Sequence, residues 1–515
     1  MGNVGCLLAA GALVLCGALA ARGAADFVSY EEFGAVGDGK VDDQAAIVAA
    51  HAAANAKGLP VRATAGRTYL IGGGDKVAVL RTDTDVGPAP FIVDDTAVKR
   101  RTEPIFRVEP DRPEFALKGV KTLARGQRQL GQSIPARSLV IAYDSKVRRY
   151  IRHGANQNAG TAQQEIFLVE RDGTIDPRTP LVWDFAEVTR LLAFPIDERT
   201  LTIRGGVFTT RANQMPSKYT YYNRNIKVHR SNVRIEGLWH FVVGEGDHGA
   251  PYEGFVTLDR CADVLITNCL FTAHRMYETI GSAGVPVNMG SYDISVGSAA
   301  NASFVNCRQT TDILDRRYWG LFGSNYSKNI LFDGCVFSRF DAHMGVANAV
   351  IRNSTLGHMG INAIGFGTFL VENTTVNGWG FFNLRADYGS TWEGDFIVRN
   401  CVYVPQGGRK ATGMLINGWN NGTHDFGYVC HMPRRIVFDG LRIEDGNHPE
   451  NYEGPYLFNA FCPEPKKDAP PPAHPIRATE EVVLKNVTTA TGRPVLLSRN
   501  KTFFKNVKVT REETK

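Results

Sequence analysis

From Leu201 onward the chain repeats one short pattern, and this repeat constrains the fold more than any other feature. Segments such as VRIEGLWH, VLITNCLF, ILFDGCVF and FLVENTTV alternate apolar residues and then reach an Asn or a Gly. Successive segments are spaced from 19 residues (Cys335 to Ser354) to 38 residues (Cys269 to Cys307). Such spacing is typical of a solenoid of stacked coils, in which the longer repeats carry loops.

The turn position of these repeats is held by Asn or Gly. Both residue types tolerate a left-handed backbone, so each marks a sharp bend between two short strands. We therefore predict an all-β, single-stranded parallel β-helix over residues 201–515. The turn residues are Asn268, Asn306, Asn353, Asn373, Asn400, Asn486 and Asn506, with Gly206, Gly237, Gly334 and Gly440 in other coils.

Four cysteines, Cys269, Cys307, Cys335 and Cys401, occupy the same place in their repeats. Small buried side chains stacked from coil to coil explain this better than disulfides or a metal site. The sequence contains neither a CxxC nor an HExxH motif, so a zinc site has little support.

The first 25 residues differ from the rest of the chain. CLLAAGALVLCGALA is continuously apolar and is followed by small residues, which resembles a secretory signal peptide. Cys16 leaves a lipoprotein anchor as the less favoured alternative, because Leu15 is bulky where such sites require a small residue. We predict a signal peptide over residues 1–25, a secreted or periplasmic location and no membrane span.

Residues 27–73 begin with FGAVGDGKVDDQAAI, continue into an Ala-rich run that should be a helix ending at Gly58, and then reach GRTYLI. This arrangement resembles the N-terminal cap of the pectate-lyase-like superfamily. Those proteins are right-handed parallel β-helices, and they include polygalacturonases and related glycosidases, polysaccharide lyases and phage tailspikes. The resemblance implies that residues 26–74 form a cap and the first coils, but it does not indicate which reaction is run.

Residues 75–200 do not repeat. Strand-like pieces such as PIFRVEP, SLVIAYD and EIFLVERDGTID predict an inserted or leading antiparallel β subdomain. Within it, residues 148–165 are rich in Arg, His and Asn. We interpret this stretch as an ordinary polar loop, with a binding edge as the alternative.

Candidate catalytic residues appear where coils are compared turn by turn. His274, Asp312, Asp341 and His358 follow their turns at nearly equal offsets, and adjacent coils lie about 4.8 Å apart. We predict a column of carboxylates and imidazoles suited to general acid–base chemistry on a glycosidic bond. Asp341 with Asp387 is the predicted acid/base pair, and Asp312 is the alternative member.

Further polar and aromatic residues surround this predicted column and would hold substrate. Aromatic side chains could also be stacking platforms for sugar rings, although packing within loops is the alternative. These are Trp319, Trp379, Trp392 and Trp419, with Tyr277, Tyr318 and Tyr388. The predicted substrate-binding residues are His274, Arg316, Trp319, Arg339, His343, His358, Arg385, Tyr388, Trp392 and Glu393.

The polygalacturonase motifs themselves are not reproduced. That family carries an Asn-Thr-Asp, adjacent aspartates, a Gly-His-Gly and an Arg-Ile-Lys on successive coils. Here Asp341 stands alone, and His358 follows Gly357 but is not followed by Gly. The resemblance therefore implies the fold without the activity.

The formal charge of +6 and the absence of a long basic run argue against a nucleic-acid partner. We predict a monomeric glycoside hydrolase that cleaves a polysaccharide and uses no metal or cofactor. A lyase of the same fold is the first alternative, and for it Ca²⁺ is possible. A non-catalytic binding protein or tailspike-like fibre is the second, and a trimeric fibre would need apolar residues facing outward along one side of the coils.

Overall fold

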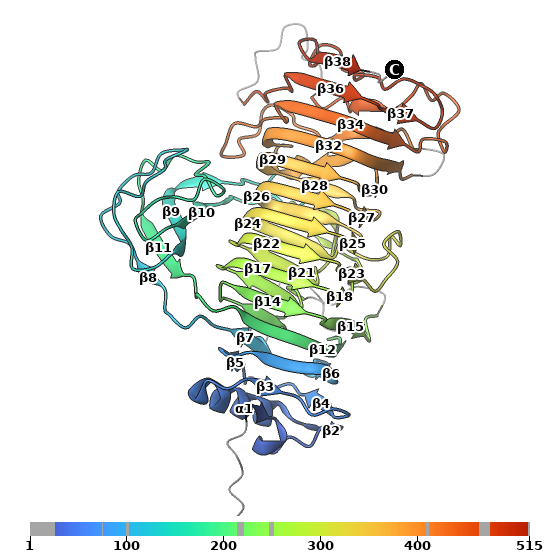
Figure 1. Ribbon diagram of the computed structural model, residues 1–515. Coiled ribbons are helices and arrows are strands. Elements are labelled where there is room, and N and C mark those ends of the chain that lie inside the picture. Colours follow the sequence, from blue (N-terminus) through green and yellow to red (C-terminus); the bar gives the residue numbers. More distant parts are fainter. Residues whose placement is uncertain are drawn as a thin grey trace, which may run out of the picture.

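The computed structural model describes residues 26–74, 76–98, 102–213, 221–246, 252–407, 411–462 and 474–512. Within these ranges, 32 strands join in one continuous hydrogen-bonded sheet that winds into a parallel β-helix (Figure 1). The predicted right-handed parallel β-helix is confirmed. The predicted signal peptide lies outside the described residues, and no helix within them is long and apolar enough to cross a membrane.

The parallel strands fall into three faces, which we call sheets A, B and C in the order in which the chain visits them. Sheet A contains β1 (Val28–Ser29), β3 (Val61–Arg62), β14 (Val233–Glu236), β17 (Ala262–Thr267), β22 (Ala300–Val305), β29 (Gly365–Glu372), β36 (Glu481–Lys485) and β38 (Lys508–Glu512). Sheet B contains β2 (Asp38–Asp42), β4 (Thr68–Ile71), β15 (Trp239–Val243), β18 (Leu270–Phe271), β23 (Arg308–Gln309), β25 (Val336–Phe337), β27 (Thr355–Leu356), β30 (Thr375–Gly378) and β37 (Thr488–Thr489).

Sheet C is the third face. It contains β5 (Ala78–Leu80), β7 (Phe106–Val108), β13 (Ile226–Val228), β16 (Val256–Asp259), β21 (Ile294–Gly297), β28 (Ile361–Ala363), β31 (Phe382–Leu384), β33 (Met414–Asn417) and β35 (Tyr456–Phe458). Longer strands bend from one sheet into the next. β6 (Thr84–Asp94), β12 (Leu201–Arg211), β32 (Trp392–Pro405) and β34 (Arg435–Ile443) run from A to B, and β24 (Phe322–Asp333) and β26 (Phe340–Arg352) run from C to A.

The predicted Asn and Gly turns lie between sheets A and B. Asn268, Asn306, Asn353 and their equivalents have φ between 47° and 54°, which confirms the left-handed bends; Asn506 is the exception. The stacked cysteines are also confirmed, because Cys269, Cys307, Cys335 and Cys401 are all buried and none of the seven described cysteines forms a disulfide.

The N-terminal cap consists of η1 (Glu31–Phe33) and α1 (Gln44–Lys57), and α1 ends at Gly58 with φ of 66°, as predicted. One buried face of α1, including Ile47 and Ala50, closes the end of the apolar core.

The antiparallel subdomain is smaller than the predicted range. Its four strands, β8 (Phe115–Ala116), β9 (Ser138–Arg149), β10 (Thr161–Val169) and β11 (Arg190–Pro195), emerge between β7 and β12 and have a separate core around Phe167. The strands β5, β6 and β7 lie within the range predicted as subdomain, yet they pair in the parallel sheet. The coils therefore begin well before Leu201. Figure 1 shows the subdomain standing against one side of the stack.

The outer face of sheet A carries a column of aliphatic side chains in register. Leu331, Val350, Leu370 and Ile397 face outward on successive coils and are half-buried, whereas their sequence neighbours point into the core. Val437 and Val483 continue this column on the next two coils.

Candidate functional site

Arg385, which follows β31, joins the two carboxylates predicted as the acid/base pair. Its Nη1 donates to both oxygens of Asp341, at 3.1 and 3.0 Å, and its Nη2 donates to Oδ2 of Asp387 at 2.7 Å. Arg339 binds Asp341 at 2.8 Å, and Arg152 of the subdomain binds Asp387 at 2.8 Å. We call these five residues, with Tyr292, the arginine–aspartate cluster.

Small residues make room for this cluster on the outer face of sheet C. Gly323 is the register neighbour of Asp341, and a Cβ there would lie 2.7 Å from the Tyr292 ring. Because Gly323 has no side chain, the Tyr292 ring can approach this strand, and its hydroxyl donates to Asp341. Gly320 accommodates Arg339 in the same way.

The cluster is roofed by two segments that approach from opposite edges of sheet C. The hairpin of β19 (Tyr277–Ile280) and β20 (Pro286–Met289) extends from the turn before β21. The segment after β9 extends from the subdomain, and its Ala155 carbonyl accepts the Ala283 N–H at 3.0 Å. Asp341 beneath has no exposed surface.

The two carboxylates are therefore held ionised. Burial alone would raise the pKa of Asp341, but the charges of Arg339 and Arg385 outweigh it and place the pKa below its usual range. Arg385 and Arg152 likewise overcome burial and depress the pKa of Asp387 strongly. A general acid must carry a proton at the working pH, so neither residue suits that role, and the predicted acid/base assignment is not supported.

The predicted column of His274, Asp312, Asp341 and His358 is wrong. Asp341 lies on a strand of sheet C, in register with Asn362, whereas the other three lie in turns between sheets B and C. Asp312 is exposed, and its carboxylate accepts the Leu314 N–H. The column failed because turns of different length follow each sheet B strand, so equal offsets do not mean equal positions.

His274 belongs instead to a buried network. Its Nδ1 lies 2.7 Å from Glu245, its Nε2 lies 3.4 Å from Asp293, and Asp293 also binds His240 at 2.8 Å. Burial lowers the pKa of His274, but the two carboxylates outweigh burial and raise the pKa to about 10. His274 is 1% exposed, so it holds the turns together and does not reach substrate.

Two of the three predicted aromatic contacts with substrate are buried, and the third residue, Trp319, is half-buried. Trp392 is completely buried, packs on Phe369 and Phe396, and donates to the Gly367 carbonyl, so it is a core residue. The ring of Tyr388 is 2% exposed. Arg339 covers one face of Trp319, 4.9 Å from the ring centroid.

Two predicted imidazoles contact protein groups. His343 bonds Asn325 at 2.9 Å, and burial lowers its pKa to about 3. His358 lies 3.2 Å from the Tyr318 carbonyl, and burial lowers its pKa as well. Both imidazoles are therefore neutral near pH 7.

Sheet C is more open beyond the cluster, on the C-terminal side. Asn362, Asn383, Asn417 and Asn459 follow Asp341 in register, one per coil, and all four are half-buried. Asn417 donates to Asn383 at 3.0 Å, and Asn459 donates to Asn417 at 2.9 Å. These amides form a ladder of hydrogen-bonding groups along the outside of the β-helix.

Two exposed tryptophans flank this ladder. Trp379 precedes β31 and is 54% exposed, and Trp419 follows β33 and is 43% exposed. The guanidinium of Arg316 lies 5.3 Å from the ring centroid of Trp379. We call the four asparagines and two tryptophans the amide groove. Flat aromatic faces beside amide donors and acceptors are the groups that a sugar chain can use.

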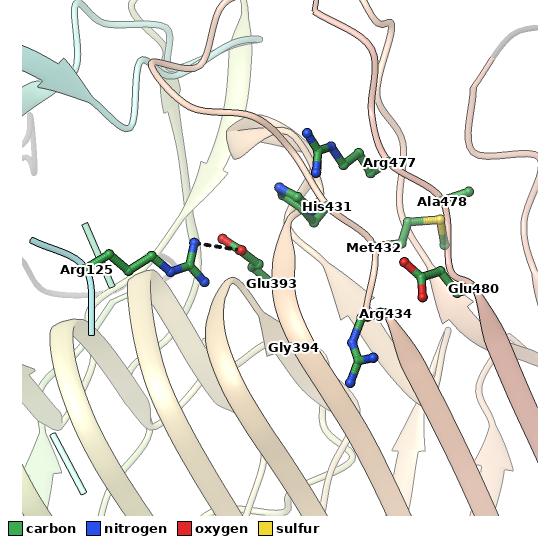
Figure 2. A pocket seen from close by; sticks show the side chains of 9 residues that line it. All are labelled: Arg125, Glu393, Gly394, His431, Met432, Arg434, Arg477, Ala478 and Glu480. Atoms are coloured by element: carbon green, nitrogen blue, oxygen red, sulfur yellow. Dashed lines mark ion pairs between the residues drawn. The ribbon is translucent and has the colours of Figure 1, made fainter. Parts of the chain in front are cut away.

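Glu393 lies away from both sites, at the start of β32. It bonds Arg125 of the subdomain at 2.8 Å and lines a cavity of about 290 Å³ (Figure 2). The structure thus separates Glu393 from the other predicted substrate-binding residues.

Several residues of these sites were missed in the sequence. Arg152 lies in the polar stretch 148–165, whose binding role was only the alternative reading. Nothing in the sequence marked Tyr292 as part of a site. A sequence pattern did mark the amide ladder: INA, FNL, ING and FNA repeat an apolar residue, an Asn and a small or apolar residue in successive coils.

Among the described residues, no group of three or more His, Cys, Asp and Glu side chains is placed to hold a metal ion. The expectation that the chain uses no cofactor remains a prediction.

No protein-family model matches the chain. One curated relative does, a capsule KL64-specific depolymerase of Klebsiella phage P510. It is 27% identical over 167 residues, which cover 29% of this chain and only 15% of that protein.

Three solved structures with the same fold are phage tailspikes. The tailspike gp61 of Pseudomonas phage phi297 matches with a TM-score of 0.52 at 15% identity, over 90% of this chain and 80% of that chain. The tailspike gp49 of Pseudomonas phage LKA1 matches with a TM-score of 0.50 at 14% identity, over 94% and 84%. The Gp54 tailspike of Acinetobacter baumannii bacteriophage AP22, in complex with a capsular saccharide, matches with a TM-score of 0.50 at 9% identity, over 94% and 79%. These matches establish the shared fold, which is the fold that the resemblance to the pectate-lyase-like superfamily implied.

Proposed function

We propose that this chain acts outside the cell on a polysaccharide, which it binds along the amide groove and degrades by hydrolysis of glycosidic bonds. The observation that carries the proposal is the in-register amide ladder with the exposed Trp379 and Trp419 beside it. The partial match to a capsule depolymerase and the tailspike fold support an extracellular polysaccharide as the substrate class.

Hydrolysis is proposed ahead of elimination because of the charges on sheet C. Elimination needs a cation free to neutralise a uronate beside a base, whereas Arg385 and Arg339 are both occupied by Asp341. Hydrolysis needs a protonated carboxyl group. Glu253, half-buried just before β16, has a pKa raised by burial and by the nearby Asp259 against the opposing charge of Lys227, but the strands β21, β24 and β26 lie between β16 and the amide groove, so it is not assigned as this acid.

The test is a screen of bacterial capsular, plant and algal polysaccharides for new reducing ends. Hydrolysis gives products without the ultraviolet absorbance of an unsaturated uronate, and elimination gives products that carry it. If the wild type releases no reducing ends from any polymer, the proposed degradation is wrong.

Binding is tested separately with the polymer that the screen identifies. Trp379→Ala and Trp419→Ala should each weaken binding about threefold to tenfold, as expected for the loss of one stacked aromatic ring. Trp239→Ala removes an equally exposed tryptophan from sheet B and is the matched control. Equal effects of all three variants would contradict the amide groove.

A second candidate, a non-catalytic fibre that binds polysaccharide, is favoured by the aliphatic column on sheet A. That column is the outward apolar feature that a trimeric fibre would need. Sedimentation velocity measures the oligomeric state, and our prediction of a monomer fails if the wild type is a trimer. A trimer that Leu370→Lys dissociates, together with no cleavage of any polymer, would establish the fibre.

A further inference from the structure

The cavity beside Glu393 lies between the subdomain and three separate parts of the coil stack. Figure 2 shows Arg125 approaching from the subdomain, opposite His431, Arg477 and Glu480. The backbone of this cleft is fixed, because Met432 donates to the Arg477 carbonyl and Glu480 donates to the Arg434 carbonyl, at 2.8 and 2.9 Å. We call it the arginine cleft.

The arginine cleft is lined by charged groups of both signs. Three guanidiniums, those of Arg125, Arg434 and Arg477, line it together with the carboxylates of Glu393 and Glu480. Arg125 is paired with Glu393, and Arg434 lies 3.4 Å from Asp395. Within the part of the chain that the structure describes, Arg477 has no carboxylate partner within 4.0 Å. Arg477 is therefore the arginine of the cleft whose guanidinium is not already in an ion pair, and it is exposed at the cavity.

The remaining groups are suited to hydroxyls. His431 is half-buried, and its burial lowers its pKa although Glu393 opposes the shift, so a neutral ring offers one donor and one acceptor. Glu480 has no cation partner within 4.0 Å among the described residues, which leaves its carboxylate oxygens available as acceptors. A guanidinium binds a carboxylate through two parallel hydrogen bonds, and carboxylate acceptors favour hydroxyl donors.

We propose that the arginine cleft binds a uronate unit of a saccharide, with the uronate carboxylate on Arg477 and its hydroxyls on Glu480 and His431. The cleft opens beside the start of β32 and the subdomain, whereas the amide groove lies on sheet C. The two are therefore separate sites. The inference depends on the proposed function only in taking the ligand to be a saccharide, because the preference for an acid follows from Arg477.

Calorimetry with the full chain tests this site. The probes are trisaccharides of glucuronate, galacturonate and mannuronate, each as the free acid and as its methyl ester, and inorganic phosphate. We expect at least one free acid to bind, with its ester about tenfold weaker or worse, and its affinity should fall as salt is added. Arg477→Gln should weaken binding about tenfold, the loss expected for one charge-assisted contact.

Two variants are controls. Arg442→Gln removes an exposed arginine outside the cleft that pairs with Glu444, and it should leave binding of the trisaccharide unchanged. Trp419→Ala should also leave it unchanged, although it weakens binding in the amide groove. If polymers are not cleaved but Arg477→Gln still weakens selective uronate binding, the proposed function is wrong and the proposed uronate site in the arginine cleft is supported.

Three results would overturn the inference. These are the absence of binding by every free acid, equal affinity for an acid and its ester, and an unchanged affinity in Arg477→Gln. Phosphate that binds as tightly as the best trisaccharide, and competes with it, would show a general anion site and would also overturn the uronate assignment.

Discussion

The carboxylate of Asp341 is fully buried and meets two guanidiniums and one phenol hydroxyl. Asp341, which was predicted to act as an acid or a base, is therefore kept ionised by its neighbours. Asp341, Asp387, Arg339 and Arg385 were predicted to share one site as an acid/base pair with substrate-binding arginines, and the structure brings the four together as ion pairs. The sequence gives no sign of the further contact with Arg152, because Arg152 lies more than 200 residues away in the chain.

We predict that Asp341→Asn destabilises the protein by about 3 kcal/mol, since removing one partner leaves buried guanidiniums uncompensated. The measurement is the free energy of unfolding in urea. Asp333→Asn is the matched control, because Asp333 pairs with Arg352 at the surface and should contribute less than about 1 kcal/mol. Equal losses in the two variants would show that the arginine–aspartate cluster does not stabilise the fold.

The pKa of His274, raised to about 10, predicts a pH dependence. Below pH 6.5 the imidazole is protonated in both the folded and the unfolded chain, and its pairs with Glu245 and Asp293 contribute in full. Between pH 6.5 and about 10 the folded chain keeps a proton that the unfolded chain has lost, so this contribution falls as pH rises.

The comparison is the free energy of unfolding of the wild type and of His274→Gln from pH 6 to pH 10. The wild type should be more stable at pH 6, and the difference should shrink toward pH 10. A difference that stays constant over this range would mean that His274 is neutral in the folded protein.

At the scale of elements, the subdomain is fastened to the coils by a buried ion pair. Lys328 of β24 donates to Glu165 of β10 at 2.6 Å, and both side chains are 3% exposed. Glu165 also accepts the backbone N–H groups of Val182 and Trp183. Burial lowers the pKa of Lys328 although Glu165 opposes the shift.

We predict that Lys328→Met costs about 3 kcal/mol or more, because it leaves the Glu165 charge buried without a partner. The double variant Lys328→Met/Glu165→Gln should recover most of that loss, since glutamine keeps an acceptor for the backbone groups and carries no charge. Urea unfolding of both variants measures this. If the double variant is no more stable than Lys328→Met, the ion pair is not what fastens the subdomain.

Elements that rest on local chemistry were predictable. The bends at Asn268 and Asn306 and the end of α1 at Gly58 follow from residue types alone. The boundary of the subdomain was not predictable from the sequence. The residues of β6 indicate a strand but not its partner, β12, which lies more than 100 residues later in the chain. The amide ladder was predictable in principle, yet its asparagines lie on strands or, for Asn459, directly after one, rather than at the expected turns.

For the whole molecule, the decisive contact is the one between Ala155 and Ala283. The subdomain and the β19–β20 hairpin leave the stack at different edges, and their meeting divides sheet C into a roofed part and an open part. Nothing in the local sequence of either segment specifies this contact, which is why a covered site was not foreseen.

This arrangement predicts that the hairpin protects the arginine–aspartate cluster from solvent. The two strands of the hairpin pair only with each other, so replacing residues 279–286 by two glycines should leave the coils intact. Phenylglyoxal, which modifies accessible guanidiniums, should then label Arg339 and Arg385 in the shortened variant much faster than in the wild type. Peptide mass spectrometry measures the labelling, and exposed Arg442 should react equally in both proteins. Unchanged labelling rates of Arg339 and Arg385 would show that packing within the coils, rather than the hairpin, excludes solvent from the arginine–aspartate cluster.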